Sequence, residues 1–544
     1  MTKQRELVIS FPLGGVSRRV GYWDRDKPYT APWAVNVRGV GLLENRVRGG
    51  SRPGLEKFYA NHFPPAVAGE ITAIASARVV DGDGNHQYDL YVIADGELYV
   101  LRSDAVLTGE SELHTEDGVA IEDEDGNTIV FDSVVTATSP FAAVGGFDTS
   151  MFGQKLYIAD SALAAYDPST SIVDTIIASA GAIPILQPLV TAYRGRLFLA
   201  GVDHIWYACR QGDVTDWNFN DDYADTARAI AGQSGEAGQV TGVIKAMIPY
   251  KDKFLAIATP NSLHVLSGEP SDGNLFNVSD QFGIIAPKAW AVSPEGTVAF
   301  LSYNGVYLWK LGSSAEPVPF SDERVPELLK DVDVTANIVL MEYDIKAKGF
   351  HLFVTPEAAT VGTHWWLDLE NKAMWPVILP QTQQPVAIGR YDIGDERSEV
   401  VLGCKDGYLR NFSASENDDD ETALNSYVVL GPFRLTTSES ADSIMKELRG
   451  TLADNAGTVT WRAFVGSSAE DVGDDAVAAI TALLAAETPS AVKATGTWAE
   501  DRNRIVRPRV RGQWCAILLS SADSWAYQSV AVTAQTLGRL RNGY

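Results

Sequence analysis

A short phrase recurs along this chain: a turn residue, then alternating apolar residues that end in an aromatic or aliphatic pair. The phrases are ADGELYV (94–100), FGQKLYIAD (152–160), YRGRLFLAG (193–201), YKDKFLAIAT (250–259), YNGVYLWK (303–310), KAKGFHLFV (346–354) and CKDGYLRNF (404–412). Glycine or aspartate supplies a tight turn, and apolar residues of period two bury one face of the strand that follows. Each phrase therefore predicts a β-hairpin.

The spacing of the phrases predicts how these hairpins are arranged. The gaps between successive turn residues are 57, 42, 57, 53, 44 and 58 residues, measured at Gly96, Gly153, Gly195, Asp252, Gly305, Gly349 and Gly407. A lone hairpin buries too little apolar surface to be stable, so repeats at this spacing must stack on one another. The spacing suits four-stranded blades of a β-propeller. We expect six or seven blades, because one blade can hold two phrases or none.

The character of the chain changes twice, which predicts an all-β protein in three parts. Residues 1–60 are expected to form an irregular N-terminal arm and docking segment, with ELVISFP as a short strand. Residues 61–427 hold the repeats and are expected to form the propeller, and the polar stretch between 213 and 243 is expected to be a long loop or insertion. Residues 428–544 are expected to form a C-terminal β-sandwich.

One helix is predicted within the sandwich. The segment DDAVAAITALLAAE (474–487) is rich in strong helix formers and has apolar residues at helical spacing. Asp474 or Asp475 is the expected N-cap. The simplest interpretation is a helix packed on the sandwich, and the alternative is a helix that contacts another subunit.

The arm is basic within an acidic protein. Among its arginines are Arg18, Arg19, Arg38, Arg46, Arg48 and Arg52. They could pair with acidic neighbours of the same chain, or they could dock the arm against an acidic partner subunit. Net charge alone does not separate these two interpretations.

The formal net charge of the whole chain is −26, which limits its partners. Such a surface repels duplex DNA and anionic membranes, although DNA could slide through a passage without sticking to it. No apolar run is long enough to span a membrane, and the start of the chain lacks the apolar core of a signal peptide. The three cysteines (Cys209, Cys404 and Cys515) are far apart and fit buried free thiols in a reducing cytosol.

Catalytic signals are sparse, so we expect a protein that is not an enzyme. The seven histidines form no metal-ligand pair of known spacing, and no nucleophile elbow, phosphate-binding loop or dinucleotide fingerprint occurs. His204, His264 and His351 lie in apolar strands and are expected to be core residues. Five tryptophans could line a sugar-binding face, but packing between blades is the preferred interpretation: Trp206, Trp217, Trp365, Trp366 and Trp375.

One stretch, DGDGNHQYD at 81–89, could bind a metal ion. Asp81, Asp83, Asn85 and Asp89 stand at relative positions 1, 3, 5 and 9, and oxygen donors at alternate positions of a tight loop can converge on Ca²⁺. The spacing resembles the calcium loops of integrin-type propeller repeats. However, His86 stands where glycine is usual, and the motif occurs once rather than in each blade. A polar hairpin tip needs the same residue types, and this is the preferred interpretation.

The order of motifs resembles a known family. The arm carries LGGV (13–16), NVR (36–38) and RGGSRPGL (48–55), and the middle of the chain carries TAYRGRLFLAGVDHIWYACRQGDVTDWNF (191–219). IPYKDKFLAIATPNSLHVLSG (248–268), FGIIAPKAWAVSPEGTVAFLSYNGVYLWK (282–310) and the closing WAYQSVAVTAQTLGRLRNGY follow. This succession resembles the tail nozzle proteins of short-tailed bacteriophages, also called tail tubular protein B or, in a related branch, packaged-DNA stabilisation protein.

The resemblance implies a structural virion protein without a catalytic site or an obligatory cofactor. Members of the family form a hexameric ring below the portal and adaptor proteins, near the tail fibres or spikes. They retain the packaged genome and conduct it during ejection without sequence-specific binding. The chain would fold and assemble in the host cytoplasm and would reside in the phage tail. An acidic wall agrees with this role, because it repels the phosphate backbone.

Two other functions remain open at this stage. A tail-tip or receptor-binding propeller would attach to host surface glycan, and it would present exposed aromatic residues on one face. A propeller glycosidase would have an axial pocket lined by two carboxylates at catalytic separation.

Overall fold

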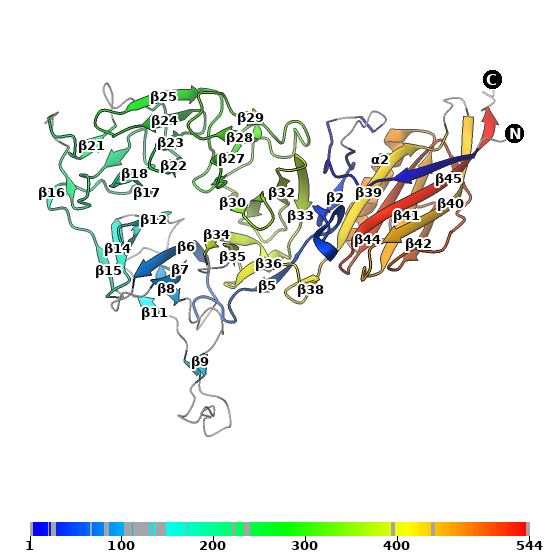
Figure 1. Cartoon of the computed structure of the whole chain (residues 1–544), viewed down its shortest axis with the longest axis horizontal. Coiled ribbons are helices and arrows are strands. Elements are labelled where there is room, and N and C mark those ends of the chain that lie inside the picture. The colour runs from blue at the N-terminus through cyan, green and yellow to red at the C-terminus, as the bar shows by residue number, and fades with distance from the viewer. Residues whose placement is uncertain are drawn as a thin grey trace.

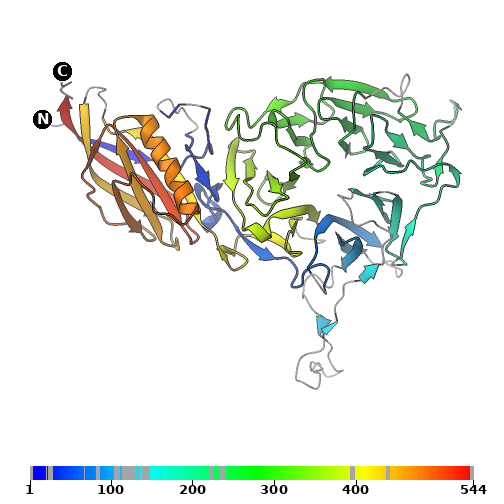
Figure 2. The same cartoon turned by 180° about the vertical axis from the view of Figure 1, so that it is seen from behind.

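The computed structural model describes residues 4–19, 21–22, 29–65, 68–80, 86–102, 111–112, 130–131, 135–137, 148–160, 162–170, 172–219, 224–232, 240–392, 398–436 and 441–539. These residues form a ring of β-sheets and, beside it, a layered β-body that carries one helix (Figure 1). Figure 2 shows the same two bodies from behind. The described residues include no helix with the length and apolar character that a membrane crossing requires.

The ring is a propeller, and the described residues give it seven blades of four antiparallel strands each. Blade 1 consists of β6 (Ile71–Val80), β7 (His86–Ala94), β8 (Glu97–Arg102) and β11 (Val135–Ala137). Blade 2 consists of β12 (Asp148–Phe152), β13 (Lys155–Ala159), β14 (Leu163–Asp167) and β15 (Ile172–Thr175). Blade 3 consists of β17 (Leu189–Tyr193), β18 (Arg196–Ala200), β19 (Tyr207–Ala208) and β21 (Ile230–Ala231). Blade 4 consists of β22 (Ala246–Tyr250), β23 (Phe254–Ala258), β24 (Leu263–Ser267) and β25 (Asn274–Ser279). Blade 5 consists of β26 (Trp290–Val292), β27 (Thr297–Ser302), β28 (Gly305–Lys310) and β29 (Val318–Pro319). Blade 6 consists of β30 (Asn337–Asp344), β31 (Gly349–Pro356), β32 (His364–Asp368) and β33 (Ala373–Val377). The predicted all-β propeller fold is therefore confirmed.

Blade 7 closes the ring with a strand from the start of the chain. It consists of β34 (Pro385–Tyr391), β35 (Glu399–Cys404), β36 (Leu409–Ser413) and β5 (Gly54–Lys57), and β37 (Asp418–Asp419) and β38 (Thr422–Ala423) extend it. In this blade Leu55 of β5 lies opposite Phe412 of β36 and is fully buried. The propeller is thus closed by backbone hydrogen bonds between its first strand in the sequence, β5, and a strand of its last blade, β36.

Each of the seven recurring phrases forms a hairpin in a different blade. Gly96, Gly195 and Gly407 have positive φ angles of 75°, 67° and 80°, which explains glycine at those turns. In blades 1, 5 and 7 the phrase joins the second and third strands, whereas in the other four blades it joins the first and second. The position of the phrase within the blade therefore differs between blades.

The second body is a β-sandwich of two sheets. One sheet contains β1 (Gln4–Ile9), β45 (Tyr527–Arg539), β40 (Ala441–Leu452) and β43 (Val510–Gly512), in that order. The other contains β2 (Ala34–Val35), β39 (Ser426–Arg434), β44 (Trp514–Ser521), β41 (Val459–Gly466) and β42 (Ala494–Trp498). Apolar residues of both sheets share one core cluster with propeller residues, so the two bodies are joined by a continuous apolar core.

Residues of the first 60 contribute strands to both bodies. β1 and β2 pair with sandwich strands, and β5 pairs with blade 7. Between them, β3 (Val37–Val40) and β4 (Val47–Ser51) form a hairpin around the short 3-10 helix η1 (Leu43–Asn45). Small two-stranded pairs complete the described strands: β9 (Ser111–Glu112) with β10 (Val130–Phe131), and β16 (Ala180–Gly181) with β20 (Asp216–Trp217).

The helix α2 (Ala469–Leu484) packs on the sandwich, but it begins earlier than the sequence predicted. Its N-cap is Ser468, whose side chain accepts a hydrogen bond from the backbone N–H of Asp471. Asp474, one of the two expected caps, instead lies inside the helix and accepts a hydrogen bond from the Tyr22 hydroxyl at 3.1 Å. The first helical turn contains Glu470 and Asp471, which favour a helix N-terminus by charge but carry no apolar periodicity.

Substitution of the N-cap tests the corrected boundary. Because Ser468 satisfies an N–H that the helix cannot pair internally, Ser468→Ala is expected to lower the free energy of unfolding by about 1 kcal/mol. Asp475→Ala, which would be the damaging change if the helix began where the sequence predicted, is the matched control and is expected to have a smaller effect. Urea denaturation followed by circular dichroism measures both, and a larger loss for Asp475→Ala would contradict the boundary.

Candidate functional site

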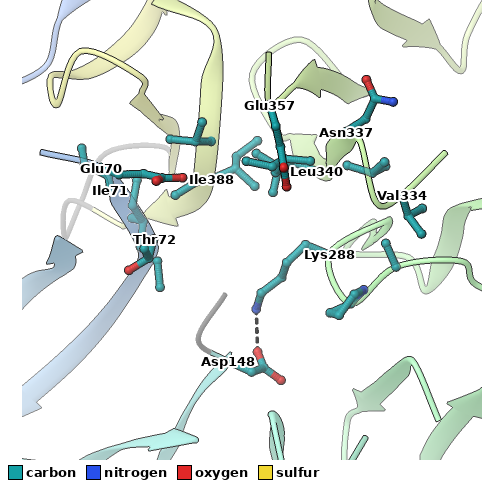
Figure 3. Close-up of a pocket in the computed structure, with 18 of the residues that line it drawn as sticks. Glu70, Ile71, Thr72, Asp148, Lys288, Val334, Asn337, Leu340, Glu357 and Ile388 are labelled. Atoms are coloured by element: carbon teal, nitrogen blue, oxygen red, sulfur yellow. Dashed lines mark hydrogen bonds and ion pairs between the residues drawn. The ribbon is translucent and has the colours of Figure 1, made fainter. Parts of the chain in front are cut away.

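A cavity with a volume of about 760 Å³ lies between blades at the axis of the propeller. Its walls come from the beginnings of innermost strands β6, β12, β30 and β34 and from the segment before β26. Figure 3 shows side chains from these separate blades converging on one space. The propeller geometry explains the site, because the innermost strands of all blades surround the axis.

Charged groups at the mouth of this axial pocket are tied to neighbouring blades. The Lys288 ammonium lies 2.5 Å from Oδ1 of Asp148, so it links blade 5 to blade 2 (Figure 3). Oδ2 of Asp148 accepts the backbone N–H of Val190 at 3.1 Å, which adds blade 3 to the same contact. This carboxylate is therefore occupied in holding three blades at the axis.

A second lysine on the other side of the axial pocket is partly withdrawn from water. Lys405 donates to the carbonyl oxygens of Pro356 and Ala358. Burial lowers the pKa of Lys405, while Glu70 and Glu357 oppose that shift. With apolar residues such as Ile71 and Leu340 beneath them, these groups form a mixed-charge rim around an apolar floor. Such a rim can hydrogen-bond a polar ligand of either charge.

The calcium prediction falls largely outside the described residues. Asp81, Asp83 and Asn85 are not among them, so no geometry is available for three of the four oxygen donors. Asp89 lies inside strand β7, opposite Arg102 of β8, and is 1% exposed. Elsewhere in the described part of the chain, no group of three or more His, Cys, Asp and Glu side chains is placed to hold a metal ion. Calcium binding at 81–89 stays a prediction.

Several side chains considered as ligands from the sequence are core residues. All five tryptophans named above are at most 3% exposed, which confirms packing as their role. His264 and His351 are likewise buried, whereas His204 is half-buried. Burial lowers the pKa of His351 to about 4 and the pKa of the neighbouring His364 to about 3. Both rings are therefore neutral in the folded protein near neutral pH.

Two arginines of the arm, Arg19 and Arg52, form ion pairs with acidic residues of the same chain. Both terminal nitrogens of Arg52 donate to Asp419, at 2.8 and 2.6 Å, and the pair is completely buried. Nε of Arg52 donates to Oδ1 of Asn36 at 3.0 Å, and the backbone N–H of Ile378 donates to the same oxygen. Arg19 forms an exposed ion pair with Asp322. The interpretation that these arginines neutralise acidic neighbours of their own chain is supported.

This arginine cluster lies in the joint between propeller and sandwich. Phe11 packs against Trp375 of the propeller, with ring centres 5.7 Å apart, and against Tyr527 of the sandwich at the same distance. Burial lowers the pKa of Arg38 to about 10, and its guanidinium lies 4.3 Å from the ring centre of Trp366. The sequence did not reveal this joint, because its partners are separated by hundreds of residues. Within the joint, Asn36 has a φ of 57°, which is unusual for a residue other than glycine.

The three cysteines provide a direct test of the packing. All are buried, and burial raises the pKa of Cys209 to about 11 and that of Cys404 to about 12. Since the thiolate is the reactive form, we expect none of the three to react with a thiol reagent such as DTNB in the native protein. All three should react in guanidinium chloride. Rapid labelling of a native cysteine, located by mass spectrometry, would contradict the described core.

The sheets just described define the class of protein: a seven-bladed β-propeller joined to a β-sandwich. No protein-family model and no curated protein matches the chain. Solved structures that resemble it include the designed Ika8 protein (13% identity, 63% of this chain, 96% of that chain, TM-score 0.35). The WD40 propeller domain of Doa1 (10%, 66%, 97%, 0.38) and YCF48 bound to D1 peptide (10%, 67%, 96%, 0.38) are also similar. With identities and TM-scores this low, these similarities say nothing about the function of the chain.

Proposed function

We propose that this chain is a structural subunit of a bacteriophage tail that forms a ring-shaped nozzle below the portal and adaptor. In this role a homohexamer retains the packaged genome and conducts it during ejection. The subunit acts by shape and charge and has no catalytic step. Its partners are further copies of itself, the adaptor or portal proteins, tail fibres or spikes, and DNA that passes without sequence-specific contacts.

The observation that carries this proposal is where the resemblance motifs lie. LGGV (13–16), NVR (36–38) and RGGSRPGL (48–55) supply the joint: Asn36 and Arg52 belong to them, and Leu55 closes blade 7. The arm phrases of this resemblance therefore lie where the propeller is joined to the second β-body. Such rigid coupling suits a subunit that must hold its shape against the pressure of packaged DNA.

The distribution of charge supports the same role. Residues 61–427 contain 53 acidic and 21 basic residues, a formal charge of −32. Residues 1–60 carry 11 basic against 5 acidic residues, and residues 428–544 carry 12 of each. The propeller therefore accounts for the whole negative charge. Because phosphate groups are repelled by such a surface, DNA can move past it without release of bound counterions.

The position of the subunit in a particle tests the proposal. Antibodies raised against the purified chain are used to label virions, and the structure is fitted into a cryo-electron microscopy map of the labelled region. We expect six copies around the tail axis, directly below the portal and adaptor. Absence of the chain from purified virions, or its location at the distal tip, would overturn the proposal. A mobility-shift assay should also show no retention of duplex DNA at physiological salt.

The axial pocket favours one alternative function, attachment to host glycan. Its mixed-charge rim and apolar floor could bind a sugar, and Glu70→Gln combined with Lys405→Met would then abolish binding on a glycan array. We expect no glycan binding by the unmodified chain. Turnover of a labelled polysaccharide that is lost in the Glu70→Gln or Glu357→Gln variant would instead indicate a glycosidase.

A further inference from the structure

Blade 2 ends in a segment that exposes large apolar side chains. We call residues 172–186 the rim segment; it contains β15 and β16. Ile177 is 81% exposed, Ile185 is 72% exposed and Leu186 is 60% exposed. Exposed apolar residues are common singly, but a group of them on one short segment marks an interaction surface.

The backbone and the charges around the rim segment agree with such a surface. Leu186 has a φ of 59°, in the left-handed region that is uncommon for a residue other than glycine. Asp174 lies exposed on β15, and β16 pairs with β20, which begins at Asp216. Asp213 is exposed close to the same strand. The rim segment is thus an apolar stretch beside the exposed carboxylates of Asp174 and Asp213, while Asp216 lies 4.0 Å from Arg210.

The opposite kind of surface lies on the sandwich. We call the solvent-facing side of β1, β45, β40 and β43, with residues 502–509 along its edge, the outer sheet face. Val8 on β1 is 69% exposed and Ile505 is 48% exposed. Ile505, Arg507, Arg509 and Arg511 are exposed and alternate with half-buried residues.

Charge on the outer sheet face is predominantly basic. Arg507 lies 3.5 Å from Glu447 and Arg511 lies 2.8 Å from Asp442, but Arg504 and Arg509 have no ion-pair partner among the residues that the structure describes. A groove of about 500 Å³ crosses this face, and it is lined by Gln4, Glu6, Glu447, Leu448, Arg449, Ile505, Ala531 and Thr533. The groove offers apolar contact at Ile505 and carries the charged residues Glu6, Glu447 and Arg449, while Arg504 and Arg509 lie on the edge of the face.

The two surfaces lie at opposite ends of the molecule. β16 is at the end of the propeller farthest from the sandwich, which holds the outer sheet face (Figure 1). The view from behind shows the same separation (Figure 2). One copy therefore cannot bring its own two surfaces together. A contact between two different patches of identical chains is heterologous, and it repeats until it closes into a ring or continues as a filament.

We propose that the rim segment of one copy docks on the outer sheet face of the next copy. Ile177, Ile185 and Leu186 enter the groove beside Ile505, and the carboxylates around β15 and β20 face the arginines of residues 504–511. The occupant is a second copy of this chain, chosen by the complementary charge of the two ends. The inference rests on the proposed ring and supplies the surfaces that hold it together.

Mixing of two variants tests the contact. Ile177→Asp/Ile185→Asp damages the rim segment, and Arg507→Glu/Arg509→Glu damages the outer sheet face; all four side chains are exposed, so folding should be preserved. Each variant alone is expected to self-associate at least about tenfold more weakly than the unmodified chain in sedimentation velocity. An equimolar mixture should form a 1:1 dimer and nothing larger, since it retains one intact rim segment and one intact outer sheet face.

Cross-linking covers the case in which assembly is weak. Ile185→Cys and Ile505→Cys are introduced on separate chains and treated with a short bismaleimide; the native cysteines are buried. We expect a cross-linked dimer in this mixture. Val318→Cys, 62% exposed on the outer strand of blade 5, replaces Ile185→Cys in the control and should not cross-link. Equal yields from the two mixtures, or variants that associate as the unmodified chain does, overturn the inference.

The experiment separates this inference from the proposed function. A ring below the portal that is unaffected by both double variants would refute the contact and leave the function standing. Association through these surfaces by a chain that is absent from virions would refute the function and leave the contact standing.

Discussion

Asp419→Ala is expected to lower the free energy of unfolding by about 3–5 kcal/mol, because it leaves the charge of Arg52 buried and unpaired. Arg52 is 0% exposed, and both of its terminal nitrogens are bound to this carboxylate. Its remaining partners, among them Asn36 and the carbonyl of Ile378, cannot neutralise it. Guanidinium chloride denaturation measures the loss, and the joint between the bodies should become the first site of proteolysis.

Two comparisons make this prediction specific. Asp322→Ala breaks the exposed ion pair that Arg19 of the arm forms with Asp322. It is expected to lower the free energy of unfolding by less than about 1 kcal/mol. Arg52→Met combined with Asp419→Ala removes both charges, so it should be more stable than Asp419→Ala alone. If the single and double variants were equally unstable, the loss would come from packing rather than from an unpaired charge.

Acid should destabilise the propeller well before its carboxylates are protonated. The folded pKa of His351 is about 4 and that of His364 about 3, both lowered by burial, whereas an unfolded histidine titrates near 6.5. Arg38 and Arg52 also disfavour a charged His351, although Asp344 opposes them. Below pH ~6.5 the unfolded chain therefore binds protons that the folded chain excludes. Stability should fall by about 1.4 kcal/mol per pH unit for each histidine, down to about pH 4.

Urea denaturation at several values between pH 7 and pH 5 measures this slope. His364→Leu should reduce the slope of stability against pH by the contribution of one histidine, even if it also changes the stability at pH 7. A His364→Leu slope equal to that of the unmodified chain would show that this histidine is accessible to protons in the folded state.

The seven hairpins could be predicted from sequence because their causes are local. A turn residue and three or four alternating apolar residues, as at 94–100, contain all the information that a hairpin needs. The number of blades was predicted only as six or seven, because the phrases alone do not show whether each blade holds one of them. The strand β5 has no such phrase, and GLEK becomes a strand through its pairing with β36. The start of α2 was missed for a similar reason. Residues 469–473 become helical by capping at Ser468 and packing beneath Tyr22, not by apolar periodicity.

The sites are predictable to a smaller extent, because they are made by residues distant in sequence. Asp148 and Lys288 meet at the axis although 140 residues separate them, and 367 residues separate Arg52 from Asp419. Neither pair has a local pattern that would distinguish it from the many other charged residues of this acidic chain. In contrast, the roles of the tryptophans followed from a general property of large aromatic side chains, which are most often buried between blades.

The pairing of β5 with β36 has a consequence for synthesis on the ribosome. Among the propeller strands, β5 emerges from the ribosome first. Its partner β36 follows more than 350 residues later, which takes roughly 20–70 s at ordinary translation speeds. Until then each nascent polypeptide presents unpaired β-edges while six blades accumulate. Translation products that end before β36 therefore cannot complete the ring.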